Sequence, residues 1–221
     1  MSPFCKVLVC CTALISACSS VKDSPKYQLG DGKYRFRQPG EKYKPVNVYV
    51  KDDSIHIYPE SDLSKPVIPK TGQSQYFLKR SFDLDVMTVL FKYRPIASEF
   101  PRQLTADFNG QVFVGFRMDR FGFNFKKTPM GLKKIHYHRG ISIGGFGGLG
   151  ATSVTPWTTN YQTTDEYNGV VLSRGLALMV GVNQLTVGIG IGWDYLTDRD
   201  KQIWIYQNKP WYGLTLGLNL N

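Results

Sequence analysis

The strongest constraint on the fold is a segment, residues 185–196, that alternates between two unlike faces. Its odd positions hold large apolar residues, whereas Gly188, Gly190 and Gly192 occupy three of the even positions. A period of two predicts a β-strand. Because a glycine weakens a strand by about 0.5–1 kcal/mol relative to alanine, three on one face need a reason. We expect this face either to line the crowded interior of a small closed barrel, with lipid against the apolar face, or to contact another backbone closely.

Two other segments divide large and small residues in the same way. Residues 170–182 place aliphatic side chains at even positions, and residues 211–221 do the same with Tyr212 and a series of leucines. We therefore expect a repeated wall pattern, with large residues pointing outward and small ones pointing into a narrow lumen. The residues expected to face the lumen in a structural role are Gly188, Gly190, Gly192, Asp194, Gly213 and Gly217.

Asp194 is the one charged residue on the small face of segment 185–196. A narrow barrel has to pair the charges in its interior, because an isolated buried charge is costly. Asp194 is therefore expected to join a buried ion-pair network of structural purpose. Its candidate partners are Asp83, Asp85 and Arg117.

Alternating segments of this kind recur through residues 76–221 and number about eight. The high glycine content and the 14 % of aromatic residues are typical of an all-β protein. We expect an antiparallel up-and-down β-barrel of about eight strands, each near ten residues long. The alternation changes parity between residues 112–118 and 121–125, and a turn at Asp119 and Arg120 would explain the change.

The pattern of loops and aromatic residues bears on whether this barrel crosses a membrane. Pairs of aromatic residues lie at expected strand ends, in positions typical of an interfacial girdle. Two features fit less well: with eight strands the longest loop, 151–168, follows the fourth strand rather than an odd one, and Asn221 is not the terminal aromatic of many such barrels. The girdle positions are Trp193, Tyr195, Trp204, Tyr206, Trp211 and Tyr212.

A shorter unit precedes the barrel. Residues 33–37, 46–50 and 55–58 alternate, and the turn cluster at 51–54 predicts a hairpin. We therefore expect a small β module at 31–60, followed by a linker at 61–75 that contains two X-Pro steps. Such a module is marginal alone and should pack on the barrel or on a partner.

The first residues are typical of an export signal. Residues 7–17 form an apolar run too short to cross a bilayer as a helix. Ile15-Ser16-Ala17-Cys18 resembles a bacterial lipobox. The resemblance implies a signal peptide at 1–17, lipidation of Cys18, a tether at 18–30 and, because Ser19 is not aspartate, sorting to the outer membrane. The ordinary alternative is a secretory signal with a chance cysteine.

Residues 188–196 and 204–221 carry a second resemblance. With Gly188-Ile-Gly-Ile-Gly-Trp-Asp-Tyr-Leu196 and Trp211-Tyr-Gly-Leu-Thr-Leu-Gly-Leu218, the chain resembles uncharacterised small outer-membrane β-barrel proteins of gliding-type Gram-negative bacteria. This resemblance covers about two thirds of the chain. It implies architecture and location, and it supplies no active residues.

Few residues suggest chemistry. All four cysteines lie at or before Cys18, so the body has no disulfide, cysteine metal site or thiol nucleophile. His136 and His138 share one strand face and are weak metal candidates, because no third ligand is apparent. The glycine-rich stretch 144–150 lacks the Lys-Ser/Thr and helix of a phosphate loop. We expect no metal and no cofactor.

These observations favour a lipid-anchored outer-membrane β-barrel with a structural or surface-interaction role. Its partners would be outer-membrane lipid and a protein bound through loop 151–168 or the front module. The net charge of +10 is spread along the chain, so nucleic-acid binding is not expected. The alternatives are a soluble, lipid-tethered, lipocalin-like barrel that binds a small apolar ligand and, less favoured, a membrane-barrel enzyme that modifies lipids.

Overall fold

The protein is an all-β structure. The computed structural model describes residues 28–51, 54–70, 72–97, 100–182 and 185–219. The described strands, all paired antiparallel, are β1 (Gly32–Arg37), β2 (Lys44–Lys51), β3 (Ser54–Pro59), β4 (Gln75–Arg94), β5 (Gln103–Thr105), β6 (Asn109–Thr128), β7 (Gly131–Val154), β8 (Tyr167–Val182), β9 (Leu185–Leu196) and β10 (Pro210–Asn219). Two 3-10 turns, η1 (Trp157–Thr159) and η2 (Arg199–Gln202), lie in loops.

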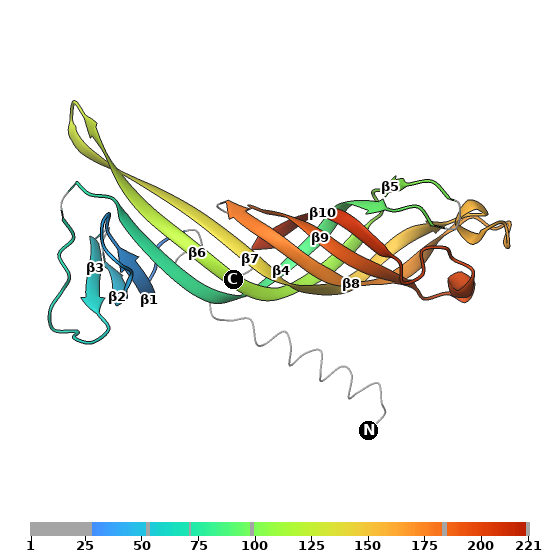
Figure 1. Ribbon diagram of the computed structural model, residues 1–221, viewed down its shortest axis with the longest axis horizontal. Coiled ribbons are helices and arrows are strands. Elements are labelled where there is room, and N and C mark those ends of the chain that lie inside the picture. Colours follow the sequence, from blue (N-terminus) through green and yellow to red (C-terminus); the bar gives the residue numbers. More distant parts are fainter. Residues whose placement is uncertain (1–27, 52–53, 71, 98–99, 183–184, 220–221) are drawn as a thin grey trace, which may run out of the picture.

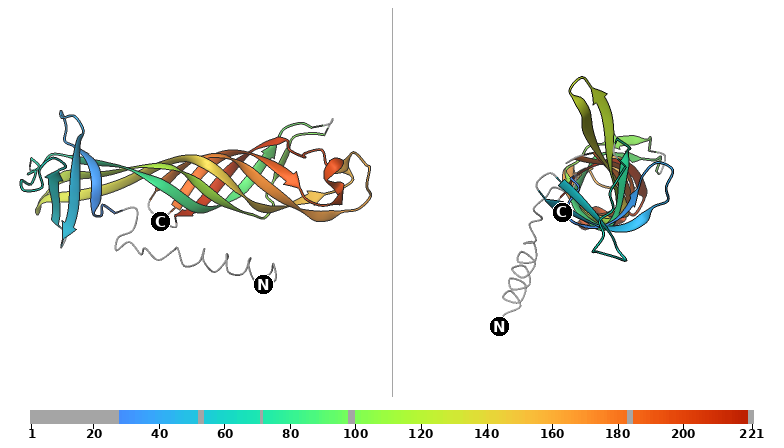
Figure 2. Two further views of the ribbon diagram at one scale, coloured as in Figure 1. Left: turned by 90° about the horizontal axis from the view of Figure 1, so that it is seen from below. Right: turned by 90° about the vertical axis from the view of Figure 1, so that its left-hand side faces the viewer.

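Six of the described strands close into a ring. They follow the order β4, β6, β7, β8, β9, β10, and β10 pairs back onto β4. The end-on view in Figure 2 shows the ring, and Figure 1 shows its strands running obliquely along the long axis. The expected all-β antiparallel class is confirmed, but the expected count of about eight barrel strands is wrong. The described chain has ten strands, of which six form the ring.

The miscount has two sources: residues 203–206 lie in a loop and not in a strand, and β6 runs without a break through Asp119 and Arg120. The expected turn at these residues does not exist. Val112, Val114, Phe116 and Met118 point out of the ring, whereas Phe121 and Phe123 are buried on the opposite face. The parity changes because one continuous strand passes from the ring, where its outward residues are apolar, to the front module, where its inward residues form the apolar core.

The front strands extend the same sheet. β1 pairs with the first residues of β4, Arg35 opposite Leu78, and β2 and β3 follow in order. A core of aromatic and aliphatic side chains joins this unit to the first part of β4 and to β6. Its buried members are Tyr34, Phe36, Val46, Val48, Ile57, Phe77, Phe121 and Phe123. The front module is therefore continuous with the wall of the ring and shares a core with it.

The connections of the ring are asymmetric. Three long connections follow β4, β7 and β9 and lie at one end of the molecule (Figure 1). The connections after β6 and β8 are short, each spanning two residues between the strand ends. Loop 155–166 thus follows the third strand of the ring, and the expectation that the longest loop follows the fourth is wrong because β6 had been divided in two.

The expected signal peptide at 1–17, Cys18 and most of the tether at 18–30 lie outside the described residues. Within the described part of the chain, no helix has the length and apolar character needed to cross a bilayer.

Candidate functional site

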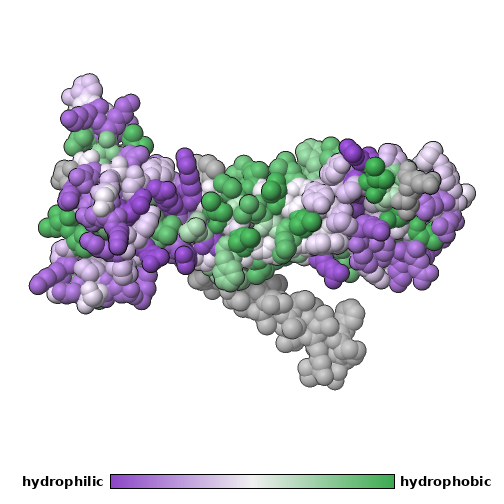
Figure 3. All heavy atoms as spheres, viewed as in Figure 1, coloured by the Kyte–Doolittle hydropathy of each residue, from purple (hydrophilic) through white to green (hydrophobic). Residues whose placement is uncertain are grey.

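An apolar belt surrounds the middle of the ring. It consists of the large side chains that alternate with inward residues on all six strands, and most of them are more than two fifths exposed. Figure 3 shows the belt as a hydrophobic band with hydrophilic surface on either side. Its most exposed members are Phe82, Phe116, Ile143, Leu149, Val170, Leu176, Ile189 and Leu218. A contiguous apolar surface of this extent marks a contact with lipid or with another protein.

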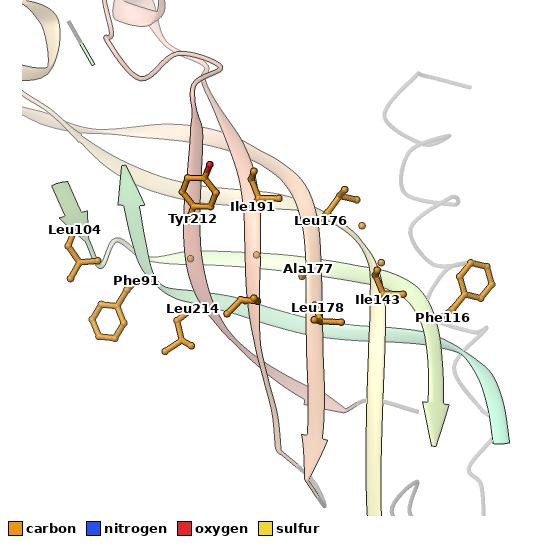
Figure 4. Close-up of a pocket in the computed structure, with 15 residues that line it drawn as sticks. Phe91, Leu104, Phe116, Ile143, Leu176, Ala177, Leu178, Ile191, Tyr212 and Leu214 are labelled. Atoms are coloured by element: carbon orange, nitrogen blue, oxygen red, sulfur yellow. The ribbon is translucent and has the colours of Figure 1, made fainter. Parts of the chain in front are cut away.

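A shallow apolar depression lies within the belt. It has a volume of about 900 Å³, and its lining comes mainly from residues of β7, β8, β9 and β10, with Phe91 and Phe116 at the margins. Figure 4 shows Leu176, Leu178 and Ile191 on the outer wall. Glycines contribute backbone to the lining, so the wall is thin there. The lining is apolar apart from backbone and the hydroxyl of Tyr212, so the depression can accept flexible apolar chains.

The inside of the ring is charged where the outside is apolar. Asp194 is fully buried and accepts hydrogen bonds from four side chains, so both of its carboxylate oxygens are occupied. The donors are Lys92 Nζ at 3.0 Å, Arg94 Nη2 at 2.5 Å, Ser173 Oγ at 2.6 Å and Trp211 Nε1 at 2.9 Å. This Asp194 cluster ties four strands of the ring together.

Aromatic rings complete the surroundings of the two cations. Lys92 Nζ lies 4.8 Å from the centre of the Trp211 ring. The guanidinium of Arg94 lies 5.3 Å from Trp204 and 5.0 Å from Tyr206. These cation–π contacts replace part of the hydration that the buried cations lose.

A second polar group, the Asp119 cluster, lies nearer the front module. Arg117 Nε donates to Asp119 at 2.8 Å, and His138 Nε2 lies 2.7 Å from the same carboxylate. Ser142 Oγ donates to Asp83 at 2.5 Å, and Arg117 Nη1 lies 3.8 Å from Asp83. All five side chains are buried, so each charge needs these partners to remain inside.

A layer of apolar side chains separates the two clusters. Phe113 and Met179 are fully buried there, and the Phe146 and Trp211 rings lie 5.8 Å apart. The layer comprises Met87, Val89, Phe113, Phe146, Ala177, Met179 and Trp211. Side chains therefore fill the middle of the ring, which is a packed core at this level.

The end with the long loops is closed by a cap. Trp204, Ile205 and Tyr206 pack on strand-end residues of β7, β8 and β9, and the Ile205 amide donates to Thr158 in the other loop. Tyr167 donates to Asp198 and Asp200 across the cap. Burial and these two carboxylates raise the pKa of the Tyr167 phenol, which keeps its proton in place.

The cap changes the interpretation of the aromatic pairs. Trp204 and Tyr206 are buried in the cap, and Trp211 is buried in the apolar layer inside the ring, so their expected girdle positions are wrong. Tyr195 and Tyr212 are exposed on the outer wall, and Trp193 is half-buried there. Tyr93 joins them, since it pairs directly with Tyr212.

The residues expected to face the lumen lie on the inside of the ring. A side chain at Gly188 would meet Thr215 and Met179, one at Gly192 would meet the Trp211 ring, and one at Gly213 would meet Val89. Gly217 faces Met179, and Gly190 has slightly more room, with its nearest neighbours at 3.4 Å. These glycines let backbone and large interior side chains approach each other.

The two histidines considered as metal ligands, His136 and His138, do not form a metal site. His138 is buried against Asp119 and stacks on Phe121, with ring centres 4.8 Å apart. His136 is exposed and contacts Phe123. Among the described residues, no group of three His, Cys, Asp or Glu side chains could hold a metal ion.

The interior partners of Asp194 were only partly foreseen. Arg117, Asp83 and Asp85 are buried in the ring as the sequence suggested, but they lie in or near the other cluster. Lys92, Arg94 and Ser173 were missed. Lys92 carries the same signal as Asp194, since it lies between the outward aromatic residues Phe91 and Tyr93. Arg94, which precedes Pro95, and Ser173, which precedes Arg174, do not carry this signal.

Comparison with models of known protein families, with curated proteins and with solved structures gives no match to this chain.

Proposed function

We propose that the ring is a β-barrel inserted in the outer membrane of a Gram-negative bacterium, lipid-anchored through Cys18, with a structural or surface-interaction role. The observation that carries the proposal is the inverted polarity of the ring. Its outer wall presents exposed Phe116, Ile143 and Ile189, while Asp194 and Arg117 are buried inside. In water this arrangement would expose a large apolar surface, whereas in a bilayer it satisfies both faces.

The height of the belt supports a bilayer location. On β8 the outward residues from Val170 to Val180 are apolar, apart from the exposed Arg174 toward the end with the long loops. At about 3.3 Å per residue and a tilt of about 40°, this run rises roughly 25 Å, which is the height of the apolar band on membrane barrels. Tyr93, Tyr195 and Tyr212 follow at the edge of the belt, where aromatic side chains favour the interface.

A ring of six strands is narrower than the common bacterial barrels, which begin at eight. Barrel diameter grows with strand number, and eight strands already leave only enough space for side chains. Six strands therefore need small residues on the inner face wherever a large side chain crosses the interior. Gly188 and Gly192 meet this need opposite Met179 and Trp211.

The loops supply an orientation and a contact surface. Membrane barrels of this class have short periplasmic turns and long outer loops. The front module and the β6–β7 hairpin then lie in the periplasm, and loop 155–166 lies at the cell surface. An exposed aromatic group there, with Trp157 5.0 Å from Tyr161 and 6.4 Å from Phe100, is a candidate contact for a partner.

The interior argues against the lipocalin-like alternative. A carrier of apolar ligands needs an apolar cavity inside and a polar outside. Here Lys92, Arg94 and Arg117 are buried inside the ring, and Phe113 and Met179 fill its middle. The buried polar side chains of the Asp194 and Asp119 clusters bind one another across the strands of the ring. This structural use of the charged groups is the basis for proposing a non-catalytic role.

The test is heat-modifiability of the full-length protein extracted from membranes. We expect the unheated sample to migrate faster in SDS gels than the boiled sample, because a closed barrel resists SDS until heated. The protein should also require detergent to stay monodisperse. A variant that lacks the acyl group and is freely soluble and monodisperse without detergent would overturn the proposal.

The lipid anchor is tested separately in the same cells. Cys18→Ser is expected to abolish labelling by radioactive palmitate, because the sulfur is the attachment point, while the heat-modifiable band remains if the barrel inserts. Normal labelling of Cys18→Ser would refute the lipid anchor, and it would leave the proposed membrane insertion of the ring unaffected.

A further inference from the structure

Three arginines form a row at one edge of the apolar belt. On β4, β6 and β7 the outward residues next to the belt, on the side of the front module, are Arg80, Arg120 and Arg139. All three are exposed. Each stands two positions from a belt residue on its own strand, as Arg139 does from Ile141. The change from apolar to cationic therefore occurs at one level on three adjacent strands.

The register places the arginines close together. Arg120 pairs directly with Arg139, and Arg80 pairs with Met118, two residues from Arg120. Directly opposite residues have Cβ atoms about 4.5–5.5 Å apart, and like charges in such positions destabilise a sheet. None of the ion pairs within the described residues involves these three side chains. The repulsion is thus not offset by a carboxylate of the described chain.

Tyrosines lie on the same face immediately beyond the row. The Arg120 guanidinium lies 4.8 Å from the centre of the Tyr76 ring, and Arg37 lies 5.4 Å from the same ring. Tyr137 covers Gly122, where a side chain would overlap its ring, and hydrogen-bonds to Tyr76. The order away from the belt is therefore apolar, arginine, tyrosine, and tyrosine rings are enriched at the headgroup level of a membrane.

We infer that Arg80, Arg120 and Arg139 bind the phosphate groups of anionic phospholipids in the leaflet on the side of the front module. The inference rests on the proposed membrane insertion. The planar guanidinium donates two parallel hydrogen bonds to a phosphate, and one diester bridges a facing arginine pair that otherwise repels. The bound phosphate cancels the repulsion between Arg120 and Arg139 and fixes the depth of the barrel.

The position of the row points to lipid rather than to a soluble anion. The row borders the belt, so the acyl chains of a lipid whose phosphate lies at Arg120 extend along Met118 and Phe116. The other edge of the belt carries Tyr93, Tyr195 and Tyr212, together with the exposed Arg174, which pairs with Trp193 and not with a second arginine. A phosphate that bridges two facing arginines is accordingly expected at one edge only.

The test is lipid binding by the full-length protein in detergent, measured by native mass spectrometry during titration with phosphatidylglycerol or phosphatidylethanolamine. The variant is R120Q/R139Q. We expect its affinity for phosphatidylglycerol to fall about tenfold or more, because each basic residue near an anionic surface contributes about a factor of five. Its affinity for phosphatidylethanolamine should fall by a smaller factor, because the ammonium group of that lipid offsets the charge of the phosphate.

The matched control is K126Q/K133Q, which removes a facing cationic pair from the same hairpin farther from the belt. We expect it to bind phosphatidylglycerol like the parent chain. An equal loss in both variants, an unchanged affinity in R120Q/R139Q, or displacement of the lipid by excess inorganic phosphate would each overturn the inference.

Heat-modifiability of the same samples separates this result from the proposed function. Both variants should keep the heat-modifiable band, because the substituted residues are exposed and hold no interior contact. A parent chain that shows the band but no preference for phosphatidylglycerol defeats the lipid site alone. A parent chain without the band defeats the membrane barrel itself.

Discussion

Asp194 joins more of the ring than any other interior side chain described above. It accepts hydrogen bonds from β4, β8 and β10 while standing on β9. Lys92 and Arg94 carry two positive charges against the single carboxylate. The cluster is therefore stable only because aromatic faces and hydroxyl groups supplement the ion pairs, and removal of the carboxylate would leave two buried cations facing each other.

At this scale we predict that Asp194→Asn destabilises the ring by about 3 kcal/mol, the cost of removing one partner from a buried ion pair. The measurement is the urea midpoint for conversion of the fast-migrating band to the slow one. Asp165→Asn is the control, because Asp165 pairs with Arg199 on the surface, where an ion pair contributes about 0–1 kcal/mol. Equal midpoints for the two variants would contradict the structural role assigned to Asp194.

At the scale of one element, β6 shows how much a strand pattern can reveal. Alternation identified two parts of the strand, 112–118 and 121–125, and the parity of each part showed which side chains share a face. The parity change after Met118 marks the level at which the apolar face turns from outside to inside. A local pattern cannot distinguish this change from a turn, since both shift the hydrophobic residues by one position.

The wall strands also depend on close backbone approach, which we test on β7. A side chain at Gly144 would overlap the carbonyl of Val114 on β6, whereas one at exposed Gly147 would lie 3.8 Å from its nearest neighbour. Gly144→Ala is expected to cost about 1–3 kcal/mol through overpacking, and Gly147→Ala to be neutral or to stabilise by about 0.5–1 kcal/mol. The stability of both variants is measured as the temperature at which the fast-migrating band converts to the slow one. If Gly144→Ala left the stability unchanged, β6 and β7 would have to lie farther apart at this position than the structure shows.

At the scale of the whole molecule, the ring has two unlike ends. One end carries the three long connections and the aromatic cap, and the other carries the front module and the long β6–β7 hairpin (Figures 1 and 2). The arginine row lies on the side of the module. This asymmetry assigns a direction to the proposed insertion, with the module in the periplasm.

Single-cysteine reporters check the direction. The body has no cysteine after Cys18, so Thr164→Cys in the long loop and Lys127→Cys near the hairpin tip each introduce one thiol there. A maleimide that cannot cross the membrane is expected to label Thr164→Cys on intact cells and Lys127→Cys only after lysis. The parent chain gives the background. The reverse pattern would invert the orientation, and labelling of both on intact cells would argue against insertion.

The sequence by itself determined the all-β class, the outward and inward faces of β8, β9 and β10, and the inward position of Asp194, because strand alternation is a local property. The tertiary structure decided which strands pair with each other and which pair closes the ring. Closure of β10 onto β4 sets the ring at six strands and brings Lys92 and Arg94 to Asp194 from about a hundred residues away. Pairing of β4 with β6 and of β6 with β7 brings Arg80, Arg120 and Arg139 close together. These outcomes depend on register between distant segments, which pairing across the sheet fixes and no single segment encodes.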